Sequence, residues 1–250
     1  LKLIFAFLFI SLGFNIAGGL GAFLLASLIG IIISFLPLRN FLSIKPIEDE
    51  INVKELILYL VPVALSFFCF IALVNFDMLL VKYFFNLQEA GFYSIAQMIG
   101  KIFLFLPGAI SIVMFPRTAG LKARNMDTDS TLKRSLLYVF LLCIIANIVY
   151  NLFPSFILKV LTGKVFAESV LLGRLFGISM SFFTLLFLLI TYFLSIKDLR
   201  FVKYLILFSL LQPLAIILFG RNLMSVQLIL CINSILIFFI HLALAYNKHE

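Results

Sequence analysis

Three ionisable side chains interrupt long apolar stretches of the chain: Asp77, Lys101 and Arg174. An ionisable group inside a membrane is costly to bury, so it normally faces a partner or a water-filled cavity. Such residues commonly mark ion or substrate pathways. We therefore take all three as candidates for contact with a charged substrate.

A polar stripe follows one face of the segment that holds Lys101. Tyr93, Gln97 and Lys101 are spaced four residues apart, which places them on one side of a helix. A polar stripe in an apolar helix should face a cavity or a partner helix. Lys101 could instead extend toward the lipid headgroups, but its position near the middle of the span favours the cavity.

Asp77 and Lys101 are expected to approach each other. The segments 55–84 and 89–116 are joined by a short connection, so they should form an antiparallel pair of helices. Measured from the turn between these segments, Asp77 lies roughly 15 Å deep and Lys101 roughly 19 Å deep. We expect both to face the interior, with their charged groups within about 8 Å. The alternative for Asp77 is an acid at the membrane interface.

Arg174 lies nearer the end of its span, about 10 Å from residue 168. It can reach the headgroups from there. It can equally offer a planar guanidinium to a phosphate or an acidic sugar, which bind two of its N–H groups at once. The sequence leaves both possibilities open.

Catalytic and metal-binding motifs are missing from the sequence. It has no Gly-x-x-x-x-Gly-Lys-Ser/Thr, His-Glu-x-x-His or Gly-x-Ser-x-Gly motif. The only histidines are His241, which we assign to an interfacial or packing role near the end of the last helix rather than to a proton relay, and His249 in the terminal tail. The cysteines lack metal-ligand spacing: Cys69, Cys143 and Cys231. We expect no enzyme activity, no metal and no cofactor.

The composition indicates whether the protein is surrounded by water or by lipid. Of its 250 residues, 64% are hydrophobic and 12% charged, and the mean hydropathy is +1.23. Soluble domains are about 45–50% apolar and about 25% charged. These values exclude a soluble globular protein, a disordered chain and a nucleic-acid-binding module. We predict an all-α polytopic membrane protein whose partner is the lipid bilayer.

The apolar stretches predict about eight transmembrane helices, because each span needs about 20 apolar residues. Glycines within 15–21 are expected to form the first turn, and Pro116 to end the fourth helix. Five amide side chains are expected to hydrogen-bond between helices: Asn147, Asn151, Gln212, Gln227 and Asn233. The expected helices are a truncated one ending near 16, then 20–38, 55–84, 89–116, 135–158, 168–195, 199–219 and 222–246.

Basic residues predict the orientation. Thirteen of the 19 lysines and arginines lie in the chain ends or in loops 39–54, 117–134 and 197–203, and only four lie in the connections on the other side. Because lysines and arginines collect in cytoplasmic loops, this predicts that both ends are cytoplasmic in a cell membrane. The same bias accounts for the net charge of +8 without an anionic partner.

Residues 54–124 resemble the start of the second lobe of polysaccharide-biosynthesis flippases (the Wzx type, in the MATE/MurJ-related MOP superfamily). The motifs that carry the resemblance are Asn75-Phe76-Asp77 and Glu89-Ala90-Gly91-Phe92-Tyr93-Ser94. Shorter matches lie at 54–56, 61–63 and 115–117. The later helices match this family only in spacing and hydropathy.

The resemblance implies a fold and an activity. Members have 12–14 helices in two lobes that rock around a central cavity. They flip a lipid-diphosphate-linked oligosaccharide to the outer leaflet by alternating access. By this comparison, 1–38 are the last two helices of the first lobe, 39–54 a cytoplasmic linker and 55–250 the second six-helix lobe. The chain would then be a fragment lacking most of the N-terminal lobe, and would not flip lipid alone.

The substrate-cavity candidates follow from the charges and the spacing described above, and two other functions stay open beside the flippase. A cation-coupled small-molecule exporter of the same fold would need acids in its cavity, where the spans hold one acid and two bases. A non-transporting membrane fragment would need none. The cavity candidates are Asp77, Tyr93, Gln97, Lys101 and Arg174.

Overall fold

The computed structural model describes residues 1–42 and 53–247. The described residues form nine α-helices and no strand, and seven of these helices are long and apolar enough to cross a membrane. The protein is therefore an all-α, multi-pass membrane protein. The chain divides into two compact units, Leu1–Asn52 and Val53–Glu250, which are described separately.

The first unit is a hairpin of α1 (Lys2–Ser11) and α2 (Asn15–Leu42). Its turn contains Gly13, whose φ of +89° suits glycine. The prediction that glycines 15–21 form the turn is wrong. A Cβ on Gly18 would lie 3.0 Å from the Cβ of Phe9, so this glycine lets the two helices pack closely.

Two further sequence predictions change in this unit. The ten residues of α1 are too few to span a bilayer, so residues 1–42 and 53–247 contain seven candidate spans, whereas about eight were predicted. Residues 39–42, predicted as the start of a linker, continue α2, and α3 already begins at Val53. The rest of that linker, 43–52, lies outside the described residues.

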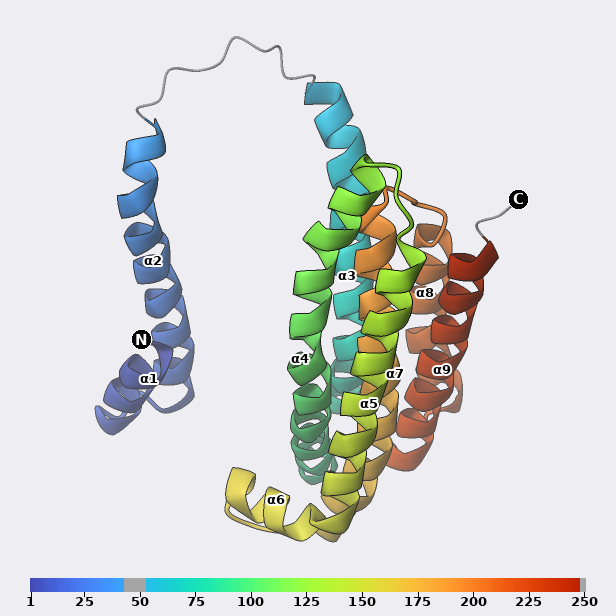
Figure 1. Ribbon diagram of the computed structural model, residues 1–250. Helices are drawn as coiled ribbons and strands as arrows, with labels where there is room; N and C mark the ends of the chain where they lie inside the picture. The colour runs from blue at the N-terminus through green and yellow to red at the C-terminus, as the bar shows by residue number, and fades with distance from the viewer. Residues whose placement is uncertain (43–52, 248–250) are drawn as a thin grey trace. The chain divides into compact units, whose positions relative to one another are not determined.

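The second unit is a bundle of long helices that run side by side, with one short helix lying across its end (Figure 1). The long helices are α3 (Val53–Phe84), α4 (Leu87–Ala123), α5 (Asp129–Leu152), α7 (Ala167–Ser195), α8 (Val202–Phe219) and α9 (Leu223–Tyr246). The short helix is α6 (Pro154–Thr162).

Helix α7 is the axis of this bundle. It contacts α3, α4, α5 and α9. In its most apolar stretch 78% of the residues are buried, against 17% in the most apolar stretch of α2. Close packing depends on small residues, as expected where lipid removes the hydrophobic drive for helix association. A Cβ on Gly100 of α4 would lie 3.0 Å from atoms of Phe176 and Met180 on α7.

Helix α4 is longer than predicted. It continues through Pro116 to Ala123, so the polar loop shrinks from 117–134 to 124–128. The turn after the proline is held against α7, because the hydroxyls of Thr118 and Ser195 hydrogen-bond at 2.6 Å. Its 37 residues span roughly 55 Å, well beyond an apolar layer of about 30 Å. The last turns of α4 therefore extend to the headgroup level.

The predicted helix 135–158 is two helices. Helix α5 begins earlier, at Asp129, and ends at Leu152, and Phe153 leaves the helical conformation. Pro154 then opens α6, at a position where its missing N–H costs nothing. Leu158 of α6 is buried, whereas Phe156 and Val160 are exposed.

The two ends of the second unit differ in charge. One end, called here the basic end, holds the start of α3, the end of α4, the start of α5 and the α7–α8 connection (Figure 1). Its described basic residues are Lys54, Arg117, Lys122, Arg124, Lys133, Arg134, Lys197, Arg200 and Lys203; the opposite end holds Lys82, Lys159, Lys164 and Arg221. Which side of a membrane this end faces stays a prediction.

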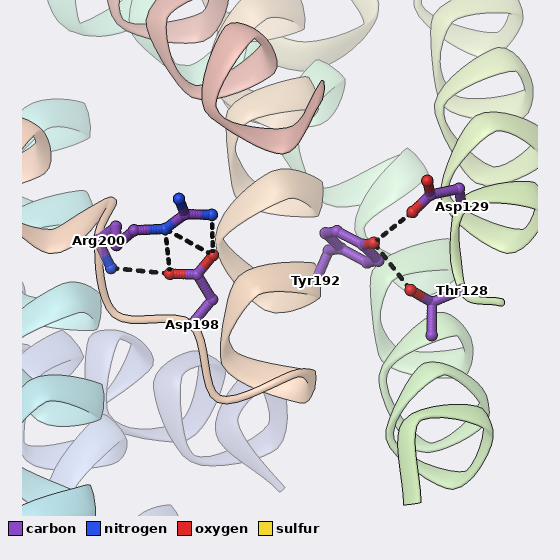
Figure 2. A network of polar contacts seen from close by, with 5 residues as sticks. All are labelled: Thr128, Asp129, Tyr192, Asp198 and Arg200. Carbon is purple, nitrogen blue, oxygen red and sulfur yellow. Dashed lines mark hydrogen bonds and ion pairs between the residues drawn. The ribbon is translucent and has the colours of Figure 1, made fainter. Parts of the chain in front are cut away.

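Polar contacts at the basic end fix the connections between helices (Figure 2). The Tyr192 hydroxyl of α7 donates to Asp129 Oδ1 at 3.1 Å and lies 2.9 Å from Thr128 Oγ1, which ties the first turn of α5 to α7. In the α7–α8 connection, Arg200 forms an ion pair with Asp198 at 2.9 Å. Hydrogen bonding to that carboxylate raises the pKa of Arg200.

Candidate functional site

The turn between α3 and α4 sets which residues of the two helices face each other. Asn86 caps α4 by accepting a hydrogen bond from the Glu89 backbone N–H at 2.9 Å, and the Glu89 carboxylate accepts from the Asn86 N–H at 3.3 Å. Counted along each helix from this turn, Tyr93 is level with Asp77. The cap thereby places the polar stripe of α4 beside the acid of α3.

Asp77 is fully buried and bonded by two neutral donors from α4. The Tyr93 hydroxyl donates to its Oδ2 at 2.8 Å, and Gln97 Nε2 donates to its Oδ1 at 3.1 Å. Gln97 also lies 3.4 Å from the carbonyl oxygen of Val74. A buried carboxylate is stable only when such donors satisfy it. The sequence prediction that these three residues share a face is confirmed.

The contacts continue from Asp77 to two more helices. Gln227 Oε1 of α9 lies 3.3 Å from the Tyr93 hydroxyl, and Gln227 Nε2 donates to Ser179 Oγ of α7 at 3.1 Å. All five side chains are buried. We call Asp77, Tyr93, Gln97, Ser179 and Gln227 the Asp77 network. It joins α3, α4, α7 and α9.

The hydroxyl hydrogen of Tyr93 has two possible acceptors in this network. The Tyr93 hydroxyl carries a single proton, yet both Asp77 Oδ2 and Gln227 Oε1 are within hydrogen-bond distance. The shorter contact and the charge favour donation to Asp77 while that group is a carboxylate. A protonated Asp77 would be a donor itself and would free the tyrosine for Gln227.

Lys101 has a different environment. It is half-buried, and its Nζ donates to Asn75 Oδ1 at 3.1 Å. Asn75 Nδ2 in turn donates to the carbonyl of Ile71 at 2.8 Å. No acidic side chain in residues 1–42 and 53–247 forms an ion pair with Lys101. Its charge is therefore held by a neutral amide.

The predicted approach of Asp77 to Lys101 does not become a direct ion pair. Because α3 ends at Phe84, Asp77 is level with Tyr93, and Lys101 lies two helical turns, or about 12 Å, farther along α4. Lys101 Nζ nevertheless bonds Asn75, only two residues from Asp77, and the charges of Lys101 and Asp77 interact through space. The predicted separation of about 8 Å stays a prediction. Asn75 points to another side of α3 from Asp77, since two residues turn a helix by about 200°.

Arg174 lies apart from these residues. It is an exposed side chain on α7, on the opposite side of that helix from Phe176, whose ring packs 5.0 Å from the ring of Tyr93. The structure thus brings together Asp77, Tyr93 and Gln97. It places Lys101 next to them and leaves Arg174 elsewhere.

Most of the amides predicted to join helices do so. Gln227 belongs to the Asp77 network, Gln212 Nε2 donates to the Leu73 carbonyl at 2.8 Å, and Asn233 Nδ2 donates to Gln212 Oε1 at 2.7 Å. Asn147 Nδ2 of α5 donates to Ser181 Oγ of α7 at 2.9 Å. Asn151 is the exception, because it bonds within α5 to the carbonyl of Asn147.

His241 is a packing residue, as predicted. It is fully buried in α9, with its ring centroid 5.9 Å from that of Phe201 and 6.4 Å from that of Phe193. Its Nδ1 lies 2.8 Å from the carbonyl of Ile237. Within the described residues, no group of three or more His, Cys, Asp and Glu side chains could hold a metal ion.

Sequence reasoning missed Ser179, and it placed Gln227 between helices without linking it to Asp77. Gln227 contacts Tyr93 and Ser179 contacts Gln227 because α7 packs on α4 and α9 packs on α7, and both helices are distant from Tyr93 in the chain. Hydropathy predicts each membrane-spanning helix, but it does not predict which of these helices are in contact. No protein-family model matches the chain, and neither a curated protein nor a solved structure is significantly similar to it.

Proposed function

We propose that this chain belongs to a transporter that flips a lipid-diphosphate-linked oligosaccharide across the cytoplasmic membrane by alternating access, for polysaccharide biosynthesis. The headgroup of such a substrate is anionic and hydrated, and its lipid tail stays in the bilayer. Passage therefore requires a hydrated path with cationic side chains inside the membrane. The basic end would face the cytoplasm.

The observation that carries the proposal is the environment of Lys101. A lysine in the middle of a spanning helix normally pairs with an acid. Here the nearby acid, Asp77, is bonded by Tyr93 and Gln97, and Lys101 is bonded by Asn75. The ammonium thus has no carboxylate within ion-pair distance among the described residues, and it is only half-buried. An anionic headgroup can reach it.

The sequence resemblance supports the same assignment. It covers 54–124, which includes the α3–α4 hairpin that holds Asn75, Asp77 and Lys101. In the proposed transporter, the side of this hairpin that carries Lys101 would line the cavity between two lobes. The Asp77 network would hold the hairpin to α7 and α9 while the lobe moves as one body.

Binding of a polyprenyl-diphosphate-linked disaccharide to the detergent-solubilised protein tests the proposal without requiring transport. Lys101→Ala should weaken binding at least about tenfold, which corresponds to about 1.4 kcal/mol. Lys101→Arg should retain most of the affinity, because it keeps the charge. Lys82→Ala, an exposed lysine at the far end of the same hairpin, is the matched control and should bind like the unmodified chain.

Unchanged binding by Lys101→Ala would refute the assignment of Lys101 as the headgroup contact. Equal loss in Lys101→Ala and Lys82→Ala would show only a general attraction of anions to the protein. In the intact gene product, flipping in proteoliposomes should fall with the same order of variants. Flipping at the unmodified rate by Lys101→Ala would contradict the functional role.

A second candidate function is a cation-coupled exporter, favoured by the two acceptors of the Tyr93 hydroxyl. Protonation of Asp77 would let Tyr93 donate to Gln227, which changes the bonding between α4 and α9. Asp77→Asn imitates the protonated acid. If proton coupling drives transport, this variant should still bind substrate but lose the dependence of transport on a pH gradient. Retained gradient dependence would exclude Asp77 as the coupling group.

A further inference from the structure

A groove between α4 and α5 opens at the basic end of the bundle. Its volume is about 430 Å³, and it holds two arginines, Arg117 of α4 and Arg134 of α5. The polar lining also includes Thr131, Ser135 and Tyr138. This groove lies outside the Asp77 network and away from Lys101.

The groove is positively charged. No acidic residue lines it, and neither arginine forms an ion pair within the described residues. The two nearest acids of the loop are engaged elsewhere. Asp129 accepts a hydrogen bond from Tyr192 (Figure 2). Asp127 Oδ1 accepts from the Asp129 backbone N–H at 2.9 Å. The contact with Tyr192 also fixes the turn of α5 that presents Thr131 and Arg134.

Two hydroxyls line the same groove. Thr131 and Ser135 are both more than nine-tenths buried, and they lie one helical turn apart on α5. No side-chain hydrogen bond of either hydroxyl is found in the part of the chain that the structure describes. Neither oxygen is among the enclosed unpaired side-chain atoms of the described residues, so both hydroxyls open to the groove and can donate to an anionic oxygen there.

The other half of the groove is apolar. Toward the middle of α4 its lining is Ile110, Val113 and Met114, and the side chain of Val113 is 71% exposed. Arg117 lies one helical turn beyond Val113, at the depth where α4 reaches the headgroups. The groove thus runs from an apolar wall to a pair of guanidinium groups, which matches the shape of a lipid.

We propose that this groove binds an anionic phospholipid of the leaflet at the basic end. Arg117 and Arg134 contact its phosphate, which a guanidinium binds through two N–H groups, and an acyl chain lies along Ile110 and Val113. Basic pockets between membrane helices are a recognised form of lipid headgroup site. The site is independent of the flippase proposal, since it uses other residues on another side of α4.

The chain contains no tryptophan, so a single introduced tryptophan can report on its neighbouring lipid. Val113→Trp places the probe in the groove. Ile112→Trp is the matched control, because Ile112 is 73% exposed, adjacent in sequence and outside the groove lining. Each full-length variant is reconstituted in vesicles in which either phosphatidylglycerol or phosphatidylcholine carries brominated acyl chains, and fluorescence quenching is compared.

At residue 113, quenching should show a preference for phosphatidylglycerol over phosphatidylcholine of at least about fivefold, the effect expected of one basic residue near a charged headgroup. At residue 112 the preference should be close to one. Equal preferences at both residues would overturn the proposal. Loss of the preference on adding millimolar inorganic phosphate would also overturn it, because the groove would then bind the free anion rather than the lipid.

A charge-matched pair of double variants tests the role of the arginines. In the Val113→Trp background, Arg117→Gln with Arg134→Gln should abolish the preference, whereas Lys122→Gln with Arg124→Gln at the same end should keep it. Arg117→Lys with Arg134→Lys retains both charges and should keep a reduced preference. Equal loss in both glutamine variants would show general surface attraction and contradict a built site. Displacement of phosphatidylglycerol by the lipid-linked saccharide would reassign the groove to that substrate.

Discussion

The α3–α4 hairpin contains two charged side chains inside the membrane, and their surroundings are opposite. Asp77 is fully buried and satisfied by Tyr93 and Gln97, whose contacts extend to α7 and α9. Lys101 is half-buried and bonded to one neutral amide. Both residues break the same rule of hydropathy, yet only one of them is accessible.

This difference distinguishes two roles for an ionisable residue inside a membrane, where burying its charge is energetically unfavourable. A sealed acid that joins four helices stabilises one arrangement of the bundle, and its hydrogen bonds have no water to compete with them. A cation that is held but not neutralised keeps its attraction for an anion. Burial and bonding partners, rather than the charge itself, therefore distinguish a structural residue from a binding residue. The following predictions test that distinction.

The largest effect should come from removing the acid. Asp77→Leu leaves the Tyr93 hydroxyl without its shorter contact and Gln97 without its carboxylate acceptor in a buried site, which should destabilise the protein by about 2–3 kcal/mol. Asp77→Asn keeps an oxygen acceptor and should lose less than half as much. Unfolding in detergent titrations measures both. If Asp77→Leu were as stable as the unmodified chain, the network would not hold the bundle together.

A second substitution would give Lys101 a charged partner, so that both charged side chains of the hairpin would be fully bonded. Asn75→Asp places a carboxylate where the amide oxygen now lies, 3.1 Å from Lys101 Nζ. The resulting ion pair should reduce binding of the diphosphate-linked saccharide about tenfold, as Lys101→Ala does, with no loss of stability. Gln88→Glu, which adds the same negative charge at an exposed position beside the α3–α4 turn, serves as a control for the change of charge in the hairpin. Undiminished binding by Asn75→Asp would show that Lys101 does not contact the substrate.

The sequence predicted the local arrangement of Asp77, Tyr93, Gln97 and Lys101 better than their contacts with distant helices. The spacing of Tyr93, Gln97 and Lys101 placed them on one face of a helix, and the short connection to α3 brought Asp77 opposite. These are local relations. The level of Asp77 relative to α4 depends on where α3 ends, and a cap at Asn86 decides that boundary. Ser179 could not be linked to this site, because its contact depends on which distant helices pack together.

The same limit applies to the fold. Composition and hydropathy predicted the all-α membrane architecture and most of the helices. Glycine and proline, however, were assigned by their local tendencies, and tertiary packing reversed two of those assignments. Gly18 packs against Phe9 inside a helical hairpin, and the helix turn that follows Pro116 is held to α7 through Thr118 and Ser195. Pro154, in contrast, has no such support and begins a new helix.

A smaller effect is expected within the Asp77 network. Tyr93→Phe removes the hydroxyl that bonds Asp77 but keeps the ring contact with Phe176, so it should destabilise the protein by about 1 kcal/mol. Combined with Gln227→Leu, the two losses should not add, because both residues belong to one set of contacts. Combined with Gln212→Leu, which bonds Leu73 instead, they should add. Additive losses in both pairs would mean that Gln227 is not coupled to Tyr93.

The smallest expected effect concerns the water accessibility of Lys101, which cysteine labelling measures directly. In a background with Cys69, Cys143 and Cys231 replaced by alanine, single cysteines are introduced at Lys101, at Asn75 and at Val74, which is 3% exposed. A charged maleimide reacts with the thiolate, which requires water around the sulfur. If the Lys101 side of the hairpin faces a hydrated path, Lys101→Cys and Asn75→Cys should react at least about ten times faster than Val74→Cys, because a thiol in apolar surroundings stays protonated. Equal, slow reaction at all three positions would place Lys101 against lipid or protein. In that case both Asp77 and Lys101 would be structural, and Lys101 could not receive a substrate.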